Sequence, residues 1–262
     1  MKIIVCIKQV LDPEAPASLF KVDKEAKRVI PPPGTPPVLN PFDENALEAA
    51  LRIKSINKAS ITILSMGRIL ARPVLRKSLA VGADELVLLE DNSFDDLDSY
   101  ATATMLATAI QKLGAYDLIL CGREAADTDA GQVGSVMAEL LEIPCITLAC
   151  KVEASENKLK VERVLSNGYE VLEVPLPALV TASSEIGTLR PATMPGIIAA
   201  QKKPVKVWNA QDLGVIPAQF KRTRLFNLVQ PVRESKCEII KADTPEEAAT
   251  RLADRLREVK VL

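Results

Sequence analysis

A loop at residues 122–134, with the sequence GREAADTDAGQVG, carries the residue types best suited to chemistry. An apolar run leads into Gly122, and the polar triplet 127–129 is followed by small Ala130 and Gly131, where a helix is expected to start. Backbone N–H groups at a helix N-terminus bind anions when no side chain covers them. The loop therefore predicts a phosphate or pyrophosphate site. It is neither GxGxxG nor a P-loop, so simple helix capping is the alternative role of its aspartates.

The acidic residues of this loop limit how it can meet an anion. A carboxylate beside a phosphate is repulsive, so at least one of Asp127 and Asp129 is expected to point away, toward a hydroxyl, a ring nitrogen or a backbone amide. Arg123 is the nearby cation that could offset the charge.

Two further segments place permissive residues at predicted strand ends, Lys8-Gln9-Val10 and Ser65-Met66-Gly67. Ligands of open α/β sheets lie at the carboxyl ends of the strands, where the strand order reverses. Lys8 could contact a phosphate or a flavin, although a lysine at a strand end is more often only solvated.

The composition excludes several classes of chemistry. The chain has 262 residues and no histidine, which removes Ser-His and Cys-His dyads, HExxH zinc sites and histidine proton shuttles. Aromatic residues make up 3% and the net charge is −1, so nucleic acid and anionic membranes are poor partners. No metal site is predicted. A self-contained hydrolase is weakened further because the sequence has no GxSxG elbow.

Cysteine usage and apolar runs indicate the compartment. The five cysteines are odd in number and form no CxxC pair, which is typical of a reduced interior. The N-terminal apolar run is too short for a signal sequence, and no run of about 18 apolar residues occurs. We expect a cytoplasmic, soluble protein.

Strands and helices alternate along the first half of the chain. Apolar runs predict strands at 2–10, 60–65, 85–89 and 116–121, and helical spacing predicts helices at 43–57, 69–82, 98–113 and 130–142. Either Asn40 or Asp43 could cap the helix at 43–57. This alternation predicts an α/β fold with a parallel, doubly wound sheet.

The pattern changes after residue 144. A strand is expected at 145–152, and two alternating runs at 157–164 and 169–174 flank Asn167-Gly168, a strong hairpin signal. The run 178–182 predicts a last core strand before a loop at 183–196. An antiparallel hairpin is therefore added to the parallel sheet.

The C-terminal part is predicted to be an arm. Residues 202–224 are basic and have little periodicity, and Thr244-Pro245 begins an amphipathic helix that ends near residue 258. We expect one domain over 1–200 and an extended arm with a C-terminal helix over 201–262. Packing of this arm on a partner chain and folding of the helix back onto its own sheet are about equally supported.

Several segments together resemble the β subunit of electron-transfer flavoproteins. They are VCIKQV, NPFDENALEAALRIK, SMG, GADELVLLED, YDLILCGREAADTDAGQVG, PLPALVTASSEI and LRPATMPGIIAAQKKPV, and they cover nearly the whole chain in order. The resemblance implies a nucleotide-α-hydrolase-like sheet and a heterodimer with an α subunit. It also implies that electrons pass between a flavin dehydrogenase and another donor or acceptor.

Carried over position by position, the family's nucleotide pocket includes all three strand ends. The residues implied are Cys6, Lys8, Gln9, Val10, Asn40, Pro41, Phe42, Asp43, Met66, Gly122, Arg123, Glu124, Ala125, Ala126, Asp127, Thr128, Asp129, Ala130, Gly131, Gln132 and Val133. In ordinary members this pocket holds AMP as a structural ligand. In electron-bifurcating members it holds a second FAD that meets NADH.

The start of the chain favours the bifurcating type. IKQVLDP is similar to the VKQVPDT of bifurcating members, and its small residues leave space for a flavin ring. The loop departs from their commoner pattern GRQAIDGDTAQVG at five positions, among them Glu124 and Gly131. AMP, or FAD without bifurcation, is the alternative. An adenine-nucleotide module without redox chemistry is a weaker one, because it would lack the 183–208 loop and the arm.

The resemblance to bifurcating members implies a reaction and its partners. NADH would give a hydride to FAD, one electron would go to ferredoxin or flavodoxin, and the other would pass through the α-subunit FAD to a dehydrogenase for an acyl-CoA or a 2-hydroxy acid. The chemistry belongs to the flavin, so no side chain is predicted to be catalytic.

Residues 190–199 correspond to the family's recognition loop, which docks the dehydrogenase through one apolar anchor. That position is Met194, between Pro191 and Pro195. Methionine adapts to transient partners, although filling of a local gap is an equally good account of it.

Overall fold

The computed structural model describes residues 1–230 and 237–262, and it divides the chain into two compact units, Met1–Asn227 and Leu228–Leu262. Residues 231–236 of the predicted arm lie outside the described residues. The first unit contains the sheet, and the described residues of the second contain the helix α7 (Pro245–Glu258).

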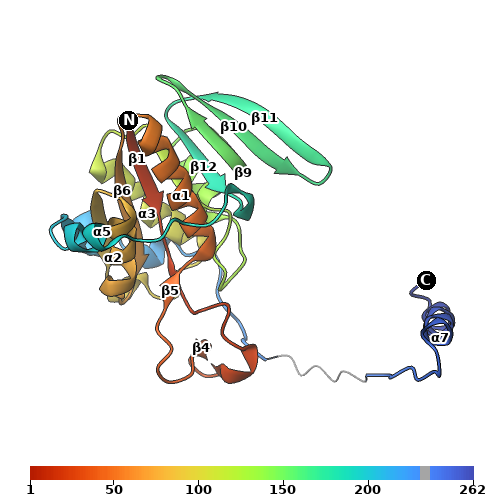
Figure 1. The fold of residues 1–262 in the computed structure, drawn as a ribbon. Coiled ribbons are helices and arrows are strands. Elements are labelled where there is room, and N and C mark those ends of the chain that lie inside the picture. Colours follow the sequence, from red (N-terminus) through yellow and green to blue (C-terminus); the bar gives the residue numbers. More distant parts are fainter. Residues whose placement is uncertain (231–236) are drawn as a thin grey trace. The chain divides into compact units, whose positions relative to one another are not determined.

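A nine-stranded sheet forms the centre of the first unit (Figure 1). Its order is β11 (Gly168–Pro175), β10 (Lys158–Leu165), β9 (Cys145–Ala154), β12 (Ala178–Ala182), β8 (Leu118–Gly122), β1 (Lys2–Cys6), β6 (Ser60–Gly67), β7 (Glu85–Glu90) and β13 (Val205–Trp208). Neighbours from β9 to β13 pair in parallel, whereas β10 pairs antiparallel with both β9 and β11. The predicted α/β class, parallel sheet and added hairpin are confirmed.

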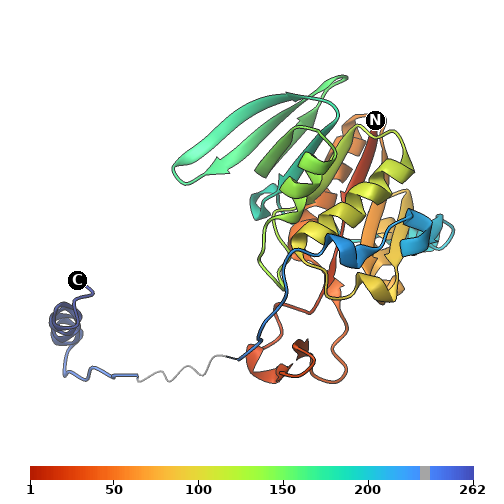
Figure 2. The same ribbon diagram turned by 180° about the vertical axis from the view of Figure 1, so that it is seen from behind.

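Helices cover both faces of the sheet, as the continuous apolar strands require (Figures 1 and 2). On one face the core includes residues of α1 (Pro41–Ile56), α2 (Arg72–Val81) and α5 (Met194–Ala200). On the other it includes residues of α3 (Ser99–Leu113), α4 (Val133–Leu140) and α6 (Ala210–Leu213). Short 3-10 turns lie at Ala17–Leu19, Asn92–Phe94, Ser184–Ile186 and Pro217–Phe220.

The strand order reverses beside β1. The chain runs from β1 to β6 and β7 on one side, and then crosses to β8 on the other. Crevices for ligands form outside the carboxyl ends of the strands at such a switch point. The fold therefore directs attention to the ends of β1 and β8, near Cys6 and Gly122.

The predicted hairpin is present, but its turn lies one residue earlier than the Asn167-Gly168 signal suggested. β10 and β11 pair from Lys158↔Pro175 to Leu165↔Gly168, so Ser166 and Asn167 make the turn and Gly168 is the first residue of β11. Gly168 has φ +150°, a conformation that side chains rarely allow. Thr244 also caps α7 as predicted, because its side chain accepts a hydrogen bond from the Glu247 N–H at 3.2 Å.

The single strand expected at 2–10 is wrong. β1 ends at Cys6, and β2 (Gln9–Val10) instead pairs with β5 (Val38–Leu39) in a separate antiparallel ladder. The apolar residues Ile7 and Val10 follow the end of β1, so periodicity alone could not locate the break. A small hairpin of β3 (Lys21–Asp23) and β4 (Arg28–Ile30) also lies in a stretch without a predicted element.

The arm was expected to begin at residue 201, but residues 201–227 belong to the first unit. β13 pairs with β7 at the edge of the sheet, and α6 packs on the face that holds α3. Packing of the arm on a partner stays a prediction. In the described part of the chain, no helix is both long and apolar enough to cross a bilayer.

Candidate functional site

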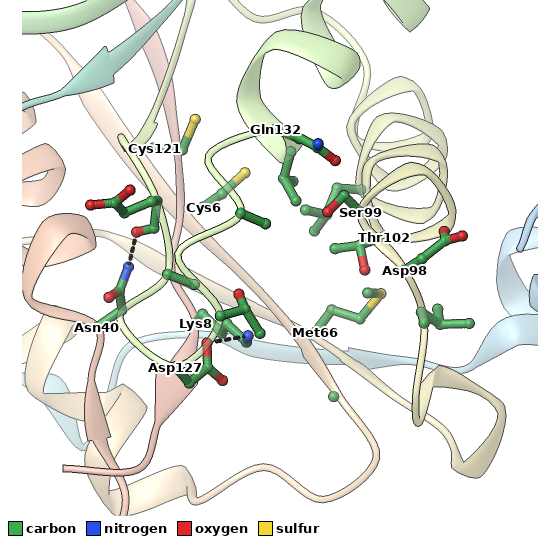
Figure 3. A pocket seen from close by; sticks show the side chains of 18 of the residues that line it. Cys6, Lys8, Asn40, Met66, Asp98, Ser99, Thr102, Cys121, Asp127 and Gln132 are labelled. Atoms are coloured by element: carbon green, nitrogen blue, oxygen red, sulfur yellow. Dashed lines mark hydrogen bonds and ion pairs between the residues drawn. The ribbon is translucent and has the colours of Figure 1, made fainter. Parts of the chain in front are cut away.

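A cavity of about 940 Å³ opens at the carboxyl ends of β1, β6 and β8, beside the first turns of α3 and α4 (Figure 3). Small-molecule and cofactor sites measure roughly 300–1,000 Å³, so this one is large. Sixteen of the predicted residues line it: Cys6, Lys8, Gln9, Asn40, Asp43, Met66, Gly122, Arg123, Glu124, Ala125, Asp127, Thr128, Ala130, Gly131, Gln132 and Val133. The three predicted strand ends thus meet in one place.

Five predicted residues lie outside the lining: Val10, Pro41, Phe42, Ala126 and Asp129. Val10 is buried. Phe42 contacts a lining residue, since the Arg123 guanidinium lies 4.7 Å from the centre of the Phe42 ring. Asp129 has φ +47°, so it shapes the turn of the loop.

Asn40 does not cap α1 with its side chain, although it stands at the N-cap position. Its Nδ2 donates to the Glu124 carbonyl at 2.8 Å, and its Oδ1 accepts from the Ala126 N–H at 3.1 Å. The capping prediction is wrong for the side chain because two backbone groups of the loop use both ends of the amide. Asn40 therefore fixes the first half of the predicted phosphate loop.

Asp43 joins the ends of two strands. Its buried carboxylate accepts from the Lys8 N–H at 2.7 Å and from the Gly122 N–H at 2.9 Å, so it does not cap α1. Burial raises its pKa to about 6, although these two N–H groups and Asn40 act in the opposite direction. A Cβ on Gly122 would lie 2.6 Å from Asp43 Oδ1, so only glycine fits there.

Lys8 and Asp127 close the loop onto the end of β1. The Lys8 ammonium lies 2.7 Å from Asp127 Oδ1 (Figure 3). This pair neutralises one of the two loop charges that would repel a phosphate. Arg123, the cation expected to do so, pairs with Glu124 at 2.6 Å instead.

The start of α4 has the open backbone that the sequence predicts. Gly131 has φ +61°, and Gln132 at the N-cap position makes no side-chain capping hydrogen bond. The first N–H groups of α4 are therefore not covered by a side-chain cap, which is the arrangement that favours an anion.

The floor of the cavity is apolar and contains two thiols. Cys6 of β1 and Cys121 of β8 come directly after the paired residues Val5 and Leu120, and both cysteines are buried. Burial raises the pKa of both thiols, so they stay uncharged. With Leu64, Met66 and Met137 they form a surface suited to a ring system.

The far wall of the cavity was missed from the sequence. Asp98, Ser99 and Thr102 of the α3 start line it, together with Arg222 and Thr223. Asp98 Oδ1 caps α3 at the Ala101 N–H at 2.9 Å, and its Oδ2 accepts from the Arg222 and Thr223 N–H groups at 2.6 Å. Asp98 before an Ala-rich helix could be recognised as a cap from the sequence. Its hydrogen bonds to Arg222 and Thr223, 124 and 125 positions away, could not, because local spacing carries no information on such distant contacts.

A second feature lies on α5. Met194 is 69% exposed at the first position of this helix, and Ile197 and Ile198 are exposed beside it. Pro191 and Pro195 are exposed too. We call Met194, Ile197 and Ile198 the α5 patch. In the described residues no group of three or more acidic or cysteine side chains is arranged to hold a metal ion.

Comparison with known proteins agrees with this architecture. The profile described as "Electron transfer flavoprotein domain" matches residues 34–213. The chain is 40% identical to the electron transfer flavoprotein subunit beta of Thermoanaerobacterium thermosaccharolyticum and 38% identical to the caffeyl-CoA reductase-Etf complex subunit CarD of Acetobacterium woodii. It is 32% identical to the acryloyl-CoA reductase electron transfer subunit gamma of Anaerotignum propionicum. Each alignment covers 100% of both chains.

Proposed function

Because this chain belongs to the electron transfer flavoprotein family, as a β subunit, we propose that its cavity binds FAD and takes electrons from NADH. In this proposal it is the bifurcating type, which sends one electron to ferredoxin or flavodoxin and the other through the α-subunit FAD to a dehydrogenase. It acts in the cytoplasm as a heterodimer with the α subunit.

The size and lining of the cavity carry the proposal. About 940 Å³ leaves room for a dinucleotide. Gln9 lies in the region where ordinary members carry bulky residues, and its side-chain amide is held by the Ile69 carbonyl and the Ala71 N–H, both at 2.7 Å. Val10 is buried outside the lining. These positions support FAD over AMP in the proposal, because neither side chain is a bulky aromatic that would fill the space for a flavin ring.

The chain's own residues would bind and orient the cofactor. The N–H groups at the start of α4 would hold the pyrophosphate, and the apolar floor at Cys6, Met66 and Cys121 would exclude water from the ring system. Bound FAD supplies the capacity to accept a hydride and release single electrons. Asn40 and Asp43 would keep the loop in place.

The dehydrogenase partner would be of the acyl-CoA or 2-hydroxy acid type. Two relatives that match along their whole length are named for caffeyl-CoA and acryloyl-CoA reductases, which supports the acyl-CoA type. The α5 patch is the proposed docking surface, with Met194 as its anchor between Pro191 and Pro195, since a contiguous exposed apolar patch often marks an interaction site. The second unit, with α7, would pack on the α subunit.

Counting nucleotides tests this function. The chain is co-expressed with its α subunit, nucleotides are released in acid, and FAD and AMP per heterodimer are measured by chromatography. Two FAD and no AMP are expected, whereas one FAD and one AMP would make the protein a simple shuttle.

Variants assign the second flavin to this cavity. D127W and G131W place bulk in the cavity lining, and E139W places the same bulk on an exposed position of α4 outside it. The two cavity variants should lose one FAD per heterodimer while E139W keeps both. Full flavin content in D127W and G131W would overturn the site.

A further inference from the structure

The segment 187–193 connects the end of the core to the α5 patch. It passes α1 on its way from the sheet to α5 (Figure 1). Loops of this kind tolerate many conformations unless other elements hold them. The contacts of this segment therefore decide how rigidly the patch is presented.

Glu48 holds the segment through Arg190. Glu48 is 5% exposed on α1, and its Oε2 accepts from the Arg190 backbone N–H at 3.1 Å and from Arg190 Nε at 3.0 Å. Its Oε1 accepts from Arg190 Nη2 and from Arg52 Nε, each at 3.0 Å. One buried carboxylate thus fixes both the backbone and the side chain of a residue 142 positions away.

A second contact from α1 lies three residues earlier in the segment. The buried Asn45 Nδ2 donates to the Gly187 carbonyl at 2.7 Å. Gly187 has φ +105°, and a Cβ there would lie 3.0 Å from Arg52 Nη2. Side chains of α1 therefore bind the segment at Gly187 and at Arg190. Arg190 lies four residues before Met194.

The other side of α5 rests on α2. A Cβ on Gly196 would lie 2.3 Å from the Ala80 carbonyl oxygen, so the two helices touch through backbone. Arg76 Nη1 donates to the Ala200 carbonyl at 3.2 Å, and Lys203 Nζ donates to the Leu79 and Ala83 carbonyls at 2.8 and 2.6 Å. α5 is thus held by α2 on one side, while Glu48 holds the segment that leads into it.

We propose that Glu48 is a positioning residue for partner docking, acting through Arg190 to hold the α5 patch ready for the dehydrogenase. This inference rests on the proposed function, which makes the α5 patch the docking surface. A preordered surface binds more tightly because less conformational freedom is lost on association. Glu48 itself is buried beneath the segment.

The test compares four variants in the full heterodimer. E48Q removes the charge, R190K keeps the charge but loses the forked donor, and M194A shortens the docking side chain itself. E44Q makes the same chemical change as E48Q on the same helix, at a residue whose side chain makes no hydrogen bond to segment 187–193. Amide hydrogen exchange of residues 187–201 and the KM for the heterodimer, with butyryl-CoA dehydrogenase as the probe, are measured for each.

E48Q and R190K should each speed exchange in residues 187–201 and raise KM about tenfold, a loss of about 1.4 kcal/mol in binding. kcat and the FAD content should stay at wild-type values, and the double variant should lose no more than one single variant, because both remove the same contact. E44Q should behave as wild type. R190K, at a half-exposed side chain, keeps the test valid if E48Q does not fold.

Two outcomes separate the possible failures. If M194A raises KM but E48Q and R190K change neither exchange nor KM, docking through α5 stands and the positioning role is wrong. If M194A leaves KM unchanged, the docking surface of the proposed function is wrong and this inference falls with it.

Discussion

The first turn of α1 and the turns that follow it hold two different loops by similar means. Asn40, just before the helix, and Asp43 fix the loop 122–134, while Asn45 and Glu48 fix segment 187–193. Each pair consists of one buried amide side chain and one buried carboxylate, and both members bind the same loop. One helix therefore positions both the proposed cofactor cavity and the proposed docking patch.

The two carboxylates differ in what they accept from. Asp43 accepts from neutral backbone N–H groups, so burial dominates and raises its pKa to about 6. Burial also acts to raise the pKa of Glu48, but the Arg190 and Arg52 hydrogen bonds outweigh it and lower the pKa. The buried Asp43 carboxylate beside the cavity therefore has no ion-pair partner that offsets its burial. The Glu48 carboxylate, by contrast, is paired with two arginines.

The largest effect is expected from removing Asp43. D43A leaves the Lys8 and Gly122 N–H groups without their acceptor, and an unsatisfied buried donor costs about 1–3 kcal/mol. The free energy of unfolding should fall by about 2–4 kcal/mol, measured by urea denaturation. E44Q is the control on the same turn. A fall under about 0.5 kcal/mol would mean that Asp43 does not join the strand ends.

Gly122→Ala should disturb the cavity around Asp43 and leave segment 187–193 and α5 unchanged. The new Cβ would meet Asp43 Oδ1 at 2.6 Å and Phe42 backbone carbon at 2.7 Å, and overpacking of this kind costs about 1–3 kcal/mol. FAD content should fall while hydrogen exchange in α5 stays at the wild-type rate. Equal loosening of both regions would show that the two ends of α1 are not independent.

The pH dependence should distinguish the two carboxylates. A folded pKa of about 6, above the usual 3.8, gives Asp43 a stabilising contribution that is complete at low pH and lost as pH rises through about 6. Between pH 5 and 7 this lowers the free energy of unfolding by about 1 kcal/mol. The lowered pKa of Glu48 makes its contribution nearly constant there, because it is complete above the ordinary pKa of 4.5 and is lost only as pH falls from that value through the folded pKa. D43N should abolish the pH 5–7 slope, whereas E48Q should retain it.

The smallest effect on stability is expected at Lys8–Asp127. Both side chains are partly exposed, and exposed ion pairs contribute about 0–1 kcal/mol. D127N should leave the midpoint of urea unfolding nearly unchanged. A shift as large as that of D43A would mean that the pair, and not Asp43, holds the loop on β1.

The near half of the cavity could be predicted, because strand-end residues and a small-residue loop carry local signals. The helix at 98–113 was predicted, but neither the capping role of Asp98 nor its hydrogen bond to the Arg222 N–H was. That contact depends on the path of residues 214–223, which have no periodicity. β13 was missed for a related reason, since a four-residue edge strand is too short to show alternation.

The roles of the α1 side chains show a further limit of sequence patterns. Asn40 and Asp43 match the capping signal of a helix start, but in the structure both side chains bind backbone groups of the loop 122–134. Glu48 and Arg52 match an ordinary i, i+4 surface pair, and the third member, Arg190, comes from another part of the chain. Local spacing identified Asn40 and Asp43 but not their partners, and it did not identify Glu48 or Arg52 as more than surface residues of a helix.

Anaerobic titration of the heterodimer with NADH tests the central claim, that FAD in the cavity at the β1–β8 switch point takes electrons from NADH. We predict that NADH bleaches the flavin absorbance of the wild-type heterodimer, and that G131W keeps the α-subunit FAD but is no longer reduced. A G131W heterodimer that retains one FAD and is still reduced by NADH at the wild-type rate would contradict the account.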